Sequence, residues 1–86
     1  MTIANSTITI YATPWCGDCK RALRVFNQHQ IDVYYVNIEE DDEARQYVEQ
    51  VNHGYQSVPT IVFPDGSVMV EPSSAALAQK LAALNR

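Results

Sequence analysis

Residues 13–20, which read TPWCGDCK, place two cysteines three positions apart between an apolar run and a basic segment. Residues 7–11 (TITIY) are β-branched and apolar, a composition that is typical of a strand. Pro14 follows that strand and breaks the chain. From Gly17 to about Gln28 the apolar residues return at helical spacing. The predicted buried face of this helix carries Cys19, Ala22, Leu23 and Phe26. The cysteine pair is therefore predicted at the junction of a strand and a helix.

A second strand and a second helix follow the first pair. Residues 33–38 (VYYVNI) are mostly apolar with little alternation, so we expect a strand covered on both faces, with Tyr34, Tyr35 or both in the core. The acidic run at residues 39–43 is expected to be a solvated loop that leads into a helix capped by Asp41 or Asp42. Gly54 is predicted to end that helix, because glycine tolerates positive φ.

The last third of the chain predicts a hairpin and a helix. Residues 60–63 and 68–70 are apolar runs joined through Asp65-Gly66, a strong hairpin signal. Pro72 with Ser73 or Ser74 opens a final helix with a leucine-lined face. The predicted order is β-α-β-α-β-β-α, an α/β fold with a four-stranded mixed sheet and three helices. The 86 residues suffice for a single small domain, residues 1–86.

Composition and charge exclude several classes of protein. The net charge is −4, and no long basic patch is present, which argues against nucleic acid as a partner. The first 14 residues lack the charged start and the long apolar core of a signal peptide or membrane span. We therefore expect a cytoplasmic protein with no membrane partner. Because cytoplasmic thiols are normally kept reduced, the two cysteines are more consistent with catalysis or metal binding than with a permanent disulfide.

The cysteine pair is suited to thiol–disulfide exchange. The attacking species is a thiolate, and a cysteine at a helix N-terminus lies beside free backbone N–H groups that stabilise it. Cys16 is predicted at this position, with Lys20 and Arg21 adding positive charge and Asp18 opposing them. Cys19 follows in the first turn on the same face and is expected to be more buried. Cys16 would then attack, and Cys19 or a free small thiol would release the product.

Other roles for the two cysteines were weighed against this one. A structural zinc site needs four ligands, and the only histidines, His29 and His53, are predicted at helix ends away from the pair. We therefore predict no metal site within one chain. A cluster shared between two chains and a pair of inert buried thiols are further alternatives.

A second motif, Ser57-Val58-Pro59-Thr60, places a proline directly before a predicted strand. Proline cannot donate to a strand ladder, so its place here has a positional reason. A cis Val58–Pro59 bond would turn the chain and expose the Val58 backbone beside the cysteine loop, where an extended substrate can pair with it. An ordinary turn proline is the alternative.

Together these pieces resemble the glutaredoxin family of the thioredoxin fold. The matching segments are residues 8–11 (ITIY), 15–19 (WCGDC), 57–60 (SVPT) and 65–66 (DG), so that the resemblance spans nearly the whole chain. Residues 51–73 are similar, more narrowly, to the mycoredoxin branch of actinobacterial glutaredoxin-like proteins. The resemblance implies Cys16 as nucleophile, Cys19 as resolving thiol and Pro59 as a cis-proline. It also implies a groove for a small thiol, lined by Trp15, Val58, Pro59, Ser73 and Ser74.

Two departures from the family pattern bear on the small thiol. Glutathione-using members usually carry a lysine shortly before the cysteine pair, where this chain has Tyr11-Ala12-Thr13. They also carry a Gly-Gly pair before an acidic segment, where this chain has Val70-Glu71 followed by Pro72-Ser73-Ser74. The negative charge of Glu71 disfavours a tripeptide with carboxylates and favours a sugar thiol such as mycothiol, with glutathione as the alternative.

The resemblance thus implies a thiol–disulfide oxidoreductase that reduces mixed disulfides between proteins and a low-molecular-weight thiol. No bound cofactor is expected, since the small thiol is a co-substrate that is itself kept reduced by an NADPH-dependent disulfide reductase. We expect a monomer. One alternative is a thioredoxin-like protein disulfide reductase, reduced by thioredoxin reductase and donating electrons to ribonucleotide reductase. Another is a dimeric module that binds an iron–sulfur cluster or zinc.

Overall fold

The computed structural model describes residues 7–84, so part of the N-terminal stretch that lacks signal-peptide features (residues 1–6) lies outside the described residues. The strands are β1 (Ile8–Ala12), β2 (Val33–Asn37), β3 (Thr60–Val62) and β4 (Val68–Val70). The helices are α1 (Gly17–Gln28), α2 (Asp42–Val51) and α3 (Ser74–Leu84). The predicted element order is confirmed.

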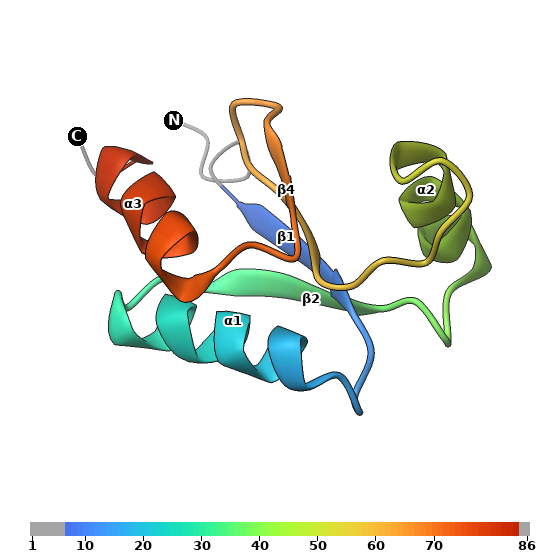
Figure 1. The fold of residues 1–86 in the computed structure, drawn as a ribbon, viewed down its shortest axis with the longest axis horizontal. Coiled ribbons are helices and arrows are strands. Elements are labelled where there is room, and N and C mark those ends of the chain that lie inside the picture. Colours follow the sequence, from blue (N-terminus) through green and yellow to red (C-terminus); the bar gives the residue numbers. More distant parts are fainter. Residues whose placement is uncertain (1–6, 85–86) are drawn as a thin grey trace.

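The four strands form one mixed sheet in the order β2-β1-β3-β4 (Figure 1). β1 pairs with β2 in parallel and with β3 in antiparallel orientation, so that Ile10 lies between Tyr35 and Ile61. β3 and β4 form the predicted antiparallel hairpin, in which Gly66 has a φ of 90°. Because β1 and β2 are parallel, the loops that follow them leave the sheet at the same edge. One of these loops carries the cysteine pair.

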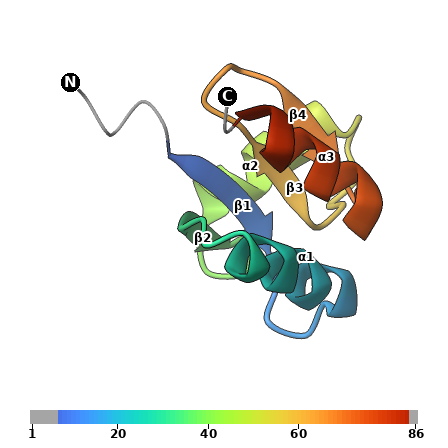
Figure 2. The ribbon, with the colours of Figure 1, turned by 90° about the vertical axis from the view of Figure 1, so that its left-hand side faces the viewer.

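Helices cover both faces of the sheet. In Figure 2, α1 and α3 lie in front of the sheet and α2 lies behind it. The larger core cluster joins the sheet to α1 and α3 and includes Cys16, Cys19, Phe26, Ile61 and Leu77. The smaller cluster, Ile38, Ala44 and Val48, joins the sheet to α2. Val58 packs against both clusters.

Strand β2 differs from the prediction of a strand covered on both faces. It lies at the edge of the sheet, and the side chains of Tyr34 and Tyr35 are 64% and 40% exposed. The prediction that one or both belong to the core is wrong. The physical reason is that the core clusters are centred on β1 and β3, so that a strand beside β1 at the edge is only partly covered.

The start of α2 agrees with the sequence signal, whereas its end differs from the prediction. Asp41 is the N-cap, and its Oδ1 accepts a hydrogen bond of 3.0 Å from the N–H of Ala44. The helix ends at Val51 with Asn52 as its C-cap, before the predicted stop at Gly54, and the first residue beyond it with a positive φ is His53, at 57°. Gly54, with a φ of 97°, shapes the turn that follows. No helix within residues 7–84 combines the length and apolar character needed to cross a membrane.

Candidate active site

Cys16 lies at the point where the loop after β1 becomes helix α1. It is the N-cap of α1, with φ −82° and ψ 116°, and its Sγ accepts a hydrogen bond of 3.1 Å from the N–H of Cys19. The Cys16 carbonyl accepts the first helical bond, 3.2 Å from the N–H of Lys20. A sulfur in the N-cap position takes the place that a serine or aspartate oxygen usually occupies. The predicted position of Cys16 at a helix N-terminus is therefore confirmed.

This position favours negative charge on the Cys16 sulfur. A backbone N–H that points at sulfur forms a stronger hydrogen bond when the sulfur is ionised. The free N–H groups and the positive end of the helix dipole act in the same direction. Asp18 and Arg21, which the sequence placed in opposition near this thiolate, form an ion pair of 2.9 Å with each other. The charges of Asp18 and Arg21 therefore offset each other beside the start of α1.

Cys19 is the more deeply buried of the two cysteines. Its side chain is only 1% exposed and belongs to the core cluster under α1 and α3. Burial, followed by a hydrogen bond with Cys16, raises the pKa of the Cys19 thiol to about 12. Both cysteines are free thiols in the structure. The Cys19 thiol therefore remains protonated at neutral pH.

The second predicted motif lies directly against the cysteine loop. The Val58–Pro59 peptide bond is cis, as predicted, and the Val58 carbonyl accepts a contact of 3.8 Å from the Cys16 Sγ. The Pro59 carbonyl accepts a hydrogen bond of 2.9 Å from the N–H of Glu71. Within residues 7–84, no group accepts a hydrogen bond from the Val58 N–H. Segments about forty positions apart in the sequence therefore meet at Cys16.

Trp15 and the start of α3 complete the set of predicted site residues. The Trp15 side chain is 70% exposed, as expected for a docking residue, and its Nε1 donates a hydrogen bond of 2.7 Å to Glu39 Oε2. Ser73 and Ser74 are exposed, and the Ser73 Oγ accepts a hydrogen bond of 3.1 Å from the N–H of Ala76, which makes Ser73 a helix cap. Glu71, two residues before Ser73, has a φ of 49°.

Sequence reasoning missed the contact between Trp15 and Glu39. Glu39 belongs to the acidic run that was interpreted as a solvated loop, and it lies 24 positions from Trp15. The only signal in the sequence is indirect: both residues follow strands that are parallel neighbours, and such strands end at the same edge of a sheet.

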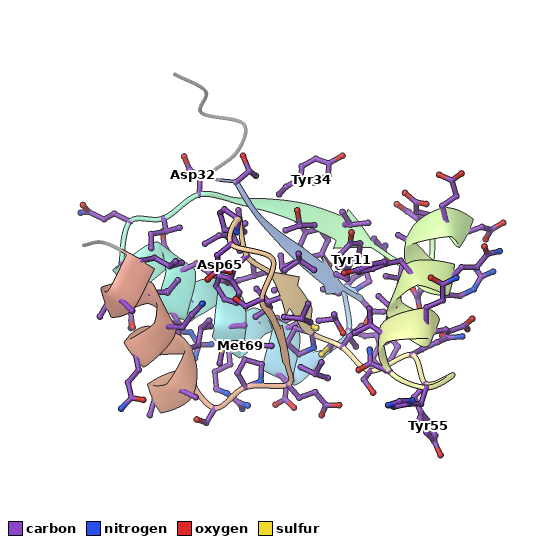
Figure 3. The ribbon with its side chains drawn as sticks, turned by 90° about the horizontal axis from the view of Figure 1, so that it is seen from above. Tyr11, Asp32, Tyr34, Tyr55, Asp65 and Met69 are labelled. Carbon is purple, nitrogen blue, oxygen red and sulfur yellow. The ribbon has the colours of Figure 1, made fainter. Side chains whose placement is uncertain are left out.

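A cavity on the other face of the sheet is separate from the cysteine pair. It has a volume of about 310 Å³ and lies against α2, lined by Tyr11, Tyr34, Val36, Asp41, Glu43, Ala44 and Tyr47. Tyr11 extends from β1 towards α2 (Figure 3), where the centroids of the Tyr11 and Tyr47 rings are 5.2 Å apart. In the described part of the chain, no three histidine, cysteine, aspartate or glutamate side chains are grouped so that they can hold a metal ion.

Comparison with known proteins gives consistent results. The model of the glutaredoxin family matches residues 8–69. Mycoredoxin 1 of Corynebacterium glutamicum is 35% identical over 92% of this chain and 98% of its own length. A Mycobacterium tuberculosis protein named as a glutaredoxin is 38% identical over 90% of this chain and 92% of its own. A crystal structure of a variant of the thioredoxin-like protein BC3987 superposes with a TM-score of 0.75 at 27% identity, covering 87% of this chain and 99% of that chain.

Proposed function

This chain belongs to the glutaredoxin family of thiol–disulfide oxidoreductases, and we propose that it reduces mixed disulfides between proteins and mycothiol through Cys16. The fold is the thioredoxin fold. The observation that carries the proposal is the contrast between the two sulfurs: Cys16 receives a backbone N–H at the start of α1, whereas Cys19 is buried with a raised pKa. The reducing cytoplasm is the compartment in which such a pair is useful.

In the first step, the Cys16 thiolate attacks the small-thiol sulfur of the mixed disulfide. One disulfide bond breaks and another forms, so that the small thiol becomes attached to Cys16 while the protein thiolate leaves and takes up a proton. The Cys19 N–H that held the Cys16 thiolate stabilises it again when it becomes the leaving group in the next step. The same hydrogen bond therefore serves both halves of the reaction.

In the second step, a thiolate must attack the disulfide that now includes Cys16. We propose that a second molecule of the small thiol does this, releasing the small-thiol disulfide and restoring the Cys16 thiolate. Cys19 attacks Cys16 only after losing its own proton, and burial of the Cys19 thiol, which raises its pKa, makes this less frequent near neutral pH. Cys19 then acts as the resolving thiol when the small thiol is scarce, forming a Cys16–Cys19 disulfide.

Docking of the mixed disulfide is proposed to use Val58, Pro59, Trp15 and the start of α3. The Val58 N–H makes no hydrogen bond within residues 7–84, so it is free to pair with an extended thiol or peptide. The backbone N–H of Glu71 is bonded to the Pro59 carbonyl, and we propose that the Glu71 carboxylate acts on the thiol that docks there. Mycothiol presents hydroxyl groups to that charge, whereas glutathione presents carboxylates, and like charges repel.

The test compares two mixed disulfides of one model protein, one with mycothiol and one with glutathione, each with its matching thiol and reductase. We expect kcat/KM to be about tenfold higher for the mycothiol disulfide, equivalent to roughly 1.4 kcal/mol. Cys19→Ser should retain at least about half of this activity, while Cys16→Ser should have none, because Cys16 alone performs the transfer.

Other outcomes have distinct meanings. A preference for glutathione would contradict the role given to Glu71 while leaving the chemistry of Cys16 intact. Loss of activity in Cys19→Ser, with the wild type turned over by thioredoxin reductase, would favour the thioredoxin-like protein disulfide reductase instead.

A further inference from the structure

The indole of Trp15 is exposed but has a defined partner. Its Nε1 donates a hydrogen bond of 2.7 Å to Glu39 Oε2 across 24 positions of sequence. A hydrogen bond to a carboxylate is stronger than one between neutral groups. Trp15 directly precedes the nucleophile and is the chain's single tryptophan. Without this partner, an indole that is 70% exposed would be free to change rotamer beside Cys16.

Glu39 is itself held by a fixed frame. Its N–H donates a hydrogen bond of 2.9 Å to Asn37 Oδ1, and the N–H of Glu40 donates one of 3.1 Å to the Asn37 carbonyl. Ile38 lies between Asn37 and Glu39 in the sequence, and its N–H donates a hydrogen bond of 3.1 Å to the Ala12 carbonyl. This bond continues the β1–β2 pairing past the end of β2. The carboxylate that receives Trp15 is therefore attached to the end of the sheet rather than to a free loop.

The strand order indicates on which side of Cys16 the hydrogen bond between Trp15 and Glu39 holds the indole. Glu39 follows β2, on one side of β1, and Val58-Pro59 precedes β3, on the other side. Cys16 follows β1, and its Sγ lies 3.8 Å from the Val58 carbonyl. The hydrogen bond to Glu39 thus holds the indole towards β2, away from the backbone beside which a substrate disulfide would approach Cys16.

We propose that Glu39 is a positioning residue for substrate docking: its carboxylate fixes the Trp15 indole on the β2 side of Cys16 and keeps the approach between Trp15 and Val58 open. This proposal rests on the proposed function, because it concerns how a mixed disulfide reaches the nucleophile. Glu39 touches neither sulfur, so its effect is on binding rather than on the transfer of sulfur.

The decisive variants separate the hydrogen bond from the charge. Glu39→Ala removes both, and Glu39→Gln removes the charge but keeps an amide oxygen that can accept from the indole. Glu40→Ala is the matched control, because it removes the neighbouring carboxylate, for which no hydrogen bond to Trp15 is present. Each variant is assayed with the mixed disulfide that the wild type reduces faster. Because Trp15 is the single tryptophan of the chain, acrylamide quenching and fluorescence anisotropy also report on it directly.

We expect Glu39→Ala to raise KM about fivefold with kcat within about twofold of the wild type, the size expected when one exposed charge-assisted hydrogen bond is lost. Quenching of Trp15 should increase and its anisotropy should fall. Glu39→Gln should stay close to the wild type in KM and in fluorescence, and Glu40→Ala should change neither. Equal thermal midpoints would show that all variants are folded.

The proposal is overturned if Glu39→Ala keeps the wild-type KM, or if its KM rises while Trp15 fluorescence is unchanged. It is also overturned if Glu39→Gln is as impaired as Glu39→Ala, since charge alone would then explain the effect. These results require an active wild type. A wild type that reduces neither mixed disulfide defeats the proposed function, and the docking role of Glu39 fails with it.

Discussion

Among single residues, Glu71 combines a costly backbone conformation with the negative charge that the proposed thiol selectivity requires. Its φ of 49° lies in the left-handed region, which costs a residue with a side chain on the order of 1 kcal/mol relative to its preferred conformations. Its N–H is bonded to the Pro59 carbonyl, so the conformation is coupled to the segment that adjoins Cys16. Related proteins that use glutathione usually have glycine here, for which such a φ carries no cost.

Replacing Glu71 tests whether its charge selects the small thiol. Glu71→Gln should raise kcat/KM for the glutathione mixed disulfide by roughly three- to tenfold and leave the mycothiol reaction nearly unchanged, because only glutathione carries carboxylates that the charge repels. Steady-state kinetics at low and high ionic strength would measure this, and the wild-type discrimination should shrink as salt screens the charge.

The variant Glu71→Gly removes the charge and also the energetic cost of the positive φ. It should therefore show the same change in discrimination between the two thiols as Glu71→Gln. Glu43→Gln, which removes a carboxylate from α2 on the other face of the sheet, is the control and should behave as the wild type. Unchanged discrimination in Glu71→Gln would mean that another feature of the site selects the thiol.

At the scale of the elements, helices α1 and α3 are each capped by the side chain of the residue that precedes them. The start of α1 holds the Cys16 sulfur through the Cys19 N–H. The start of α3 is closed by Ser73, whose Oγ accepts from Ala76 and whose carbonyl accepts from Leu77 at 3.0 Å. Because the Ser73 hydroxyl is used in capping the helix, we predict that Ser74 is the serine that binds substrate.

Substitution of the two serines separates helix capping from substrate binding. Ser73→Ala should lower the free energy of unfolding by about 1 kcal/mol, since the N–H of Ala76 loses its partner. Ser74→Ala should be neutral or slightly stabilising, because alanine is a better helix former than serine. Urea denaturation measures the stability of both variants, and KM for the mycothiol mixed disulfide measures their substrate binding. Equal stability of the two variants would rule out the capping role.

The elements themselves were largely predictable because their signals are local. Apolar periodicity, the Asp41 cap and the Asp65-Gly66 turn act over a few residues, and the structure contains the elements that they predict. Whether a strand lies at the centre or the edge is decided by its neighbours, so the apolar run of β2 could not show that Tyr34 and Tyr35 are exposed.

The same distinction between local signals and contacts of distant segments applies to the site. Cys16, Cys19 and Pro59 stand out through spacing and residue type, and the positions of all three at the site agree with the prediction. The contact of Trp15 with Glu39 and the φ of Glu71 depend on how distant segments meet, which no local pattern encodes.

For the whole molecule, the cysteine pair is part of the hydrophobic core rather than an addition to its surface. Cys16 and Cys19 are 8% and 1% exposed and pack with β1, β3, α1 and α3 in the larger cluster. Val58, which lies against the Cys16 sulfur, also contacts the smaller cluster beneath α2. Ionisation of the buried thiol is therefore linked to the stability of the entire fold.

This linkage predicts a loss of stability at alkaline pH that depends on Cys19. Its pKa is about 12 in the folded protein against an ordinary value of 9.0, so above pH 9 the unfolded chain releases a proton that the folded chain retains. The free energy of unfolding should then fall between about pH 9 and 12, by at most roughly 1.4 kcal/mol per pH unit for one group. Below pH 9 both states are protonated and the contribution is fully present.

Urea midpoints at pH 8 and pH 10.5, measured under reducing conditions, would test the linkage. The wild type should lose more stability between these pH values than Cys19→Ser, which has no thiol to ionise at that position. Tyr11→Phe is the matched control: burial also raises the pKa of Tyr11, so its replacement should remove a separate part of the loss and leave the Cys19 part in place. An equal loss in the wild type and Cys19→Ser would mean that Cys19 ionises as readily in the folded core as in the unfolded chain, and the division of labour between the two sulfurs would then have no basis in burial.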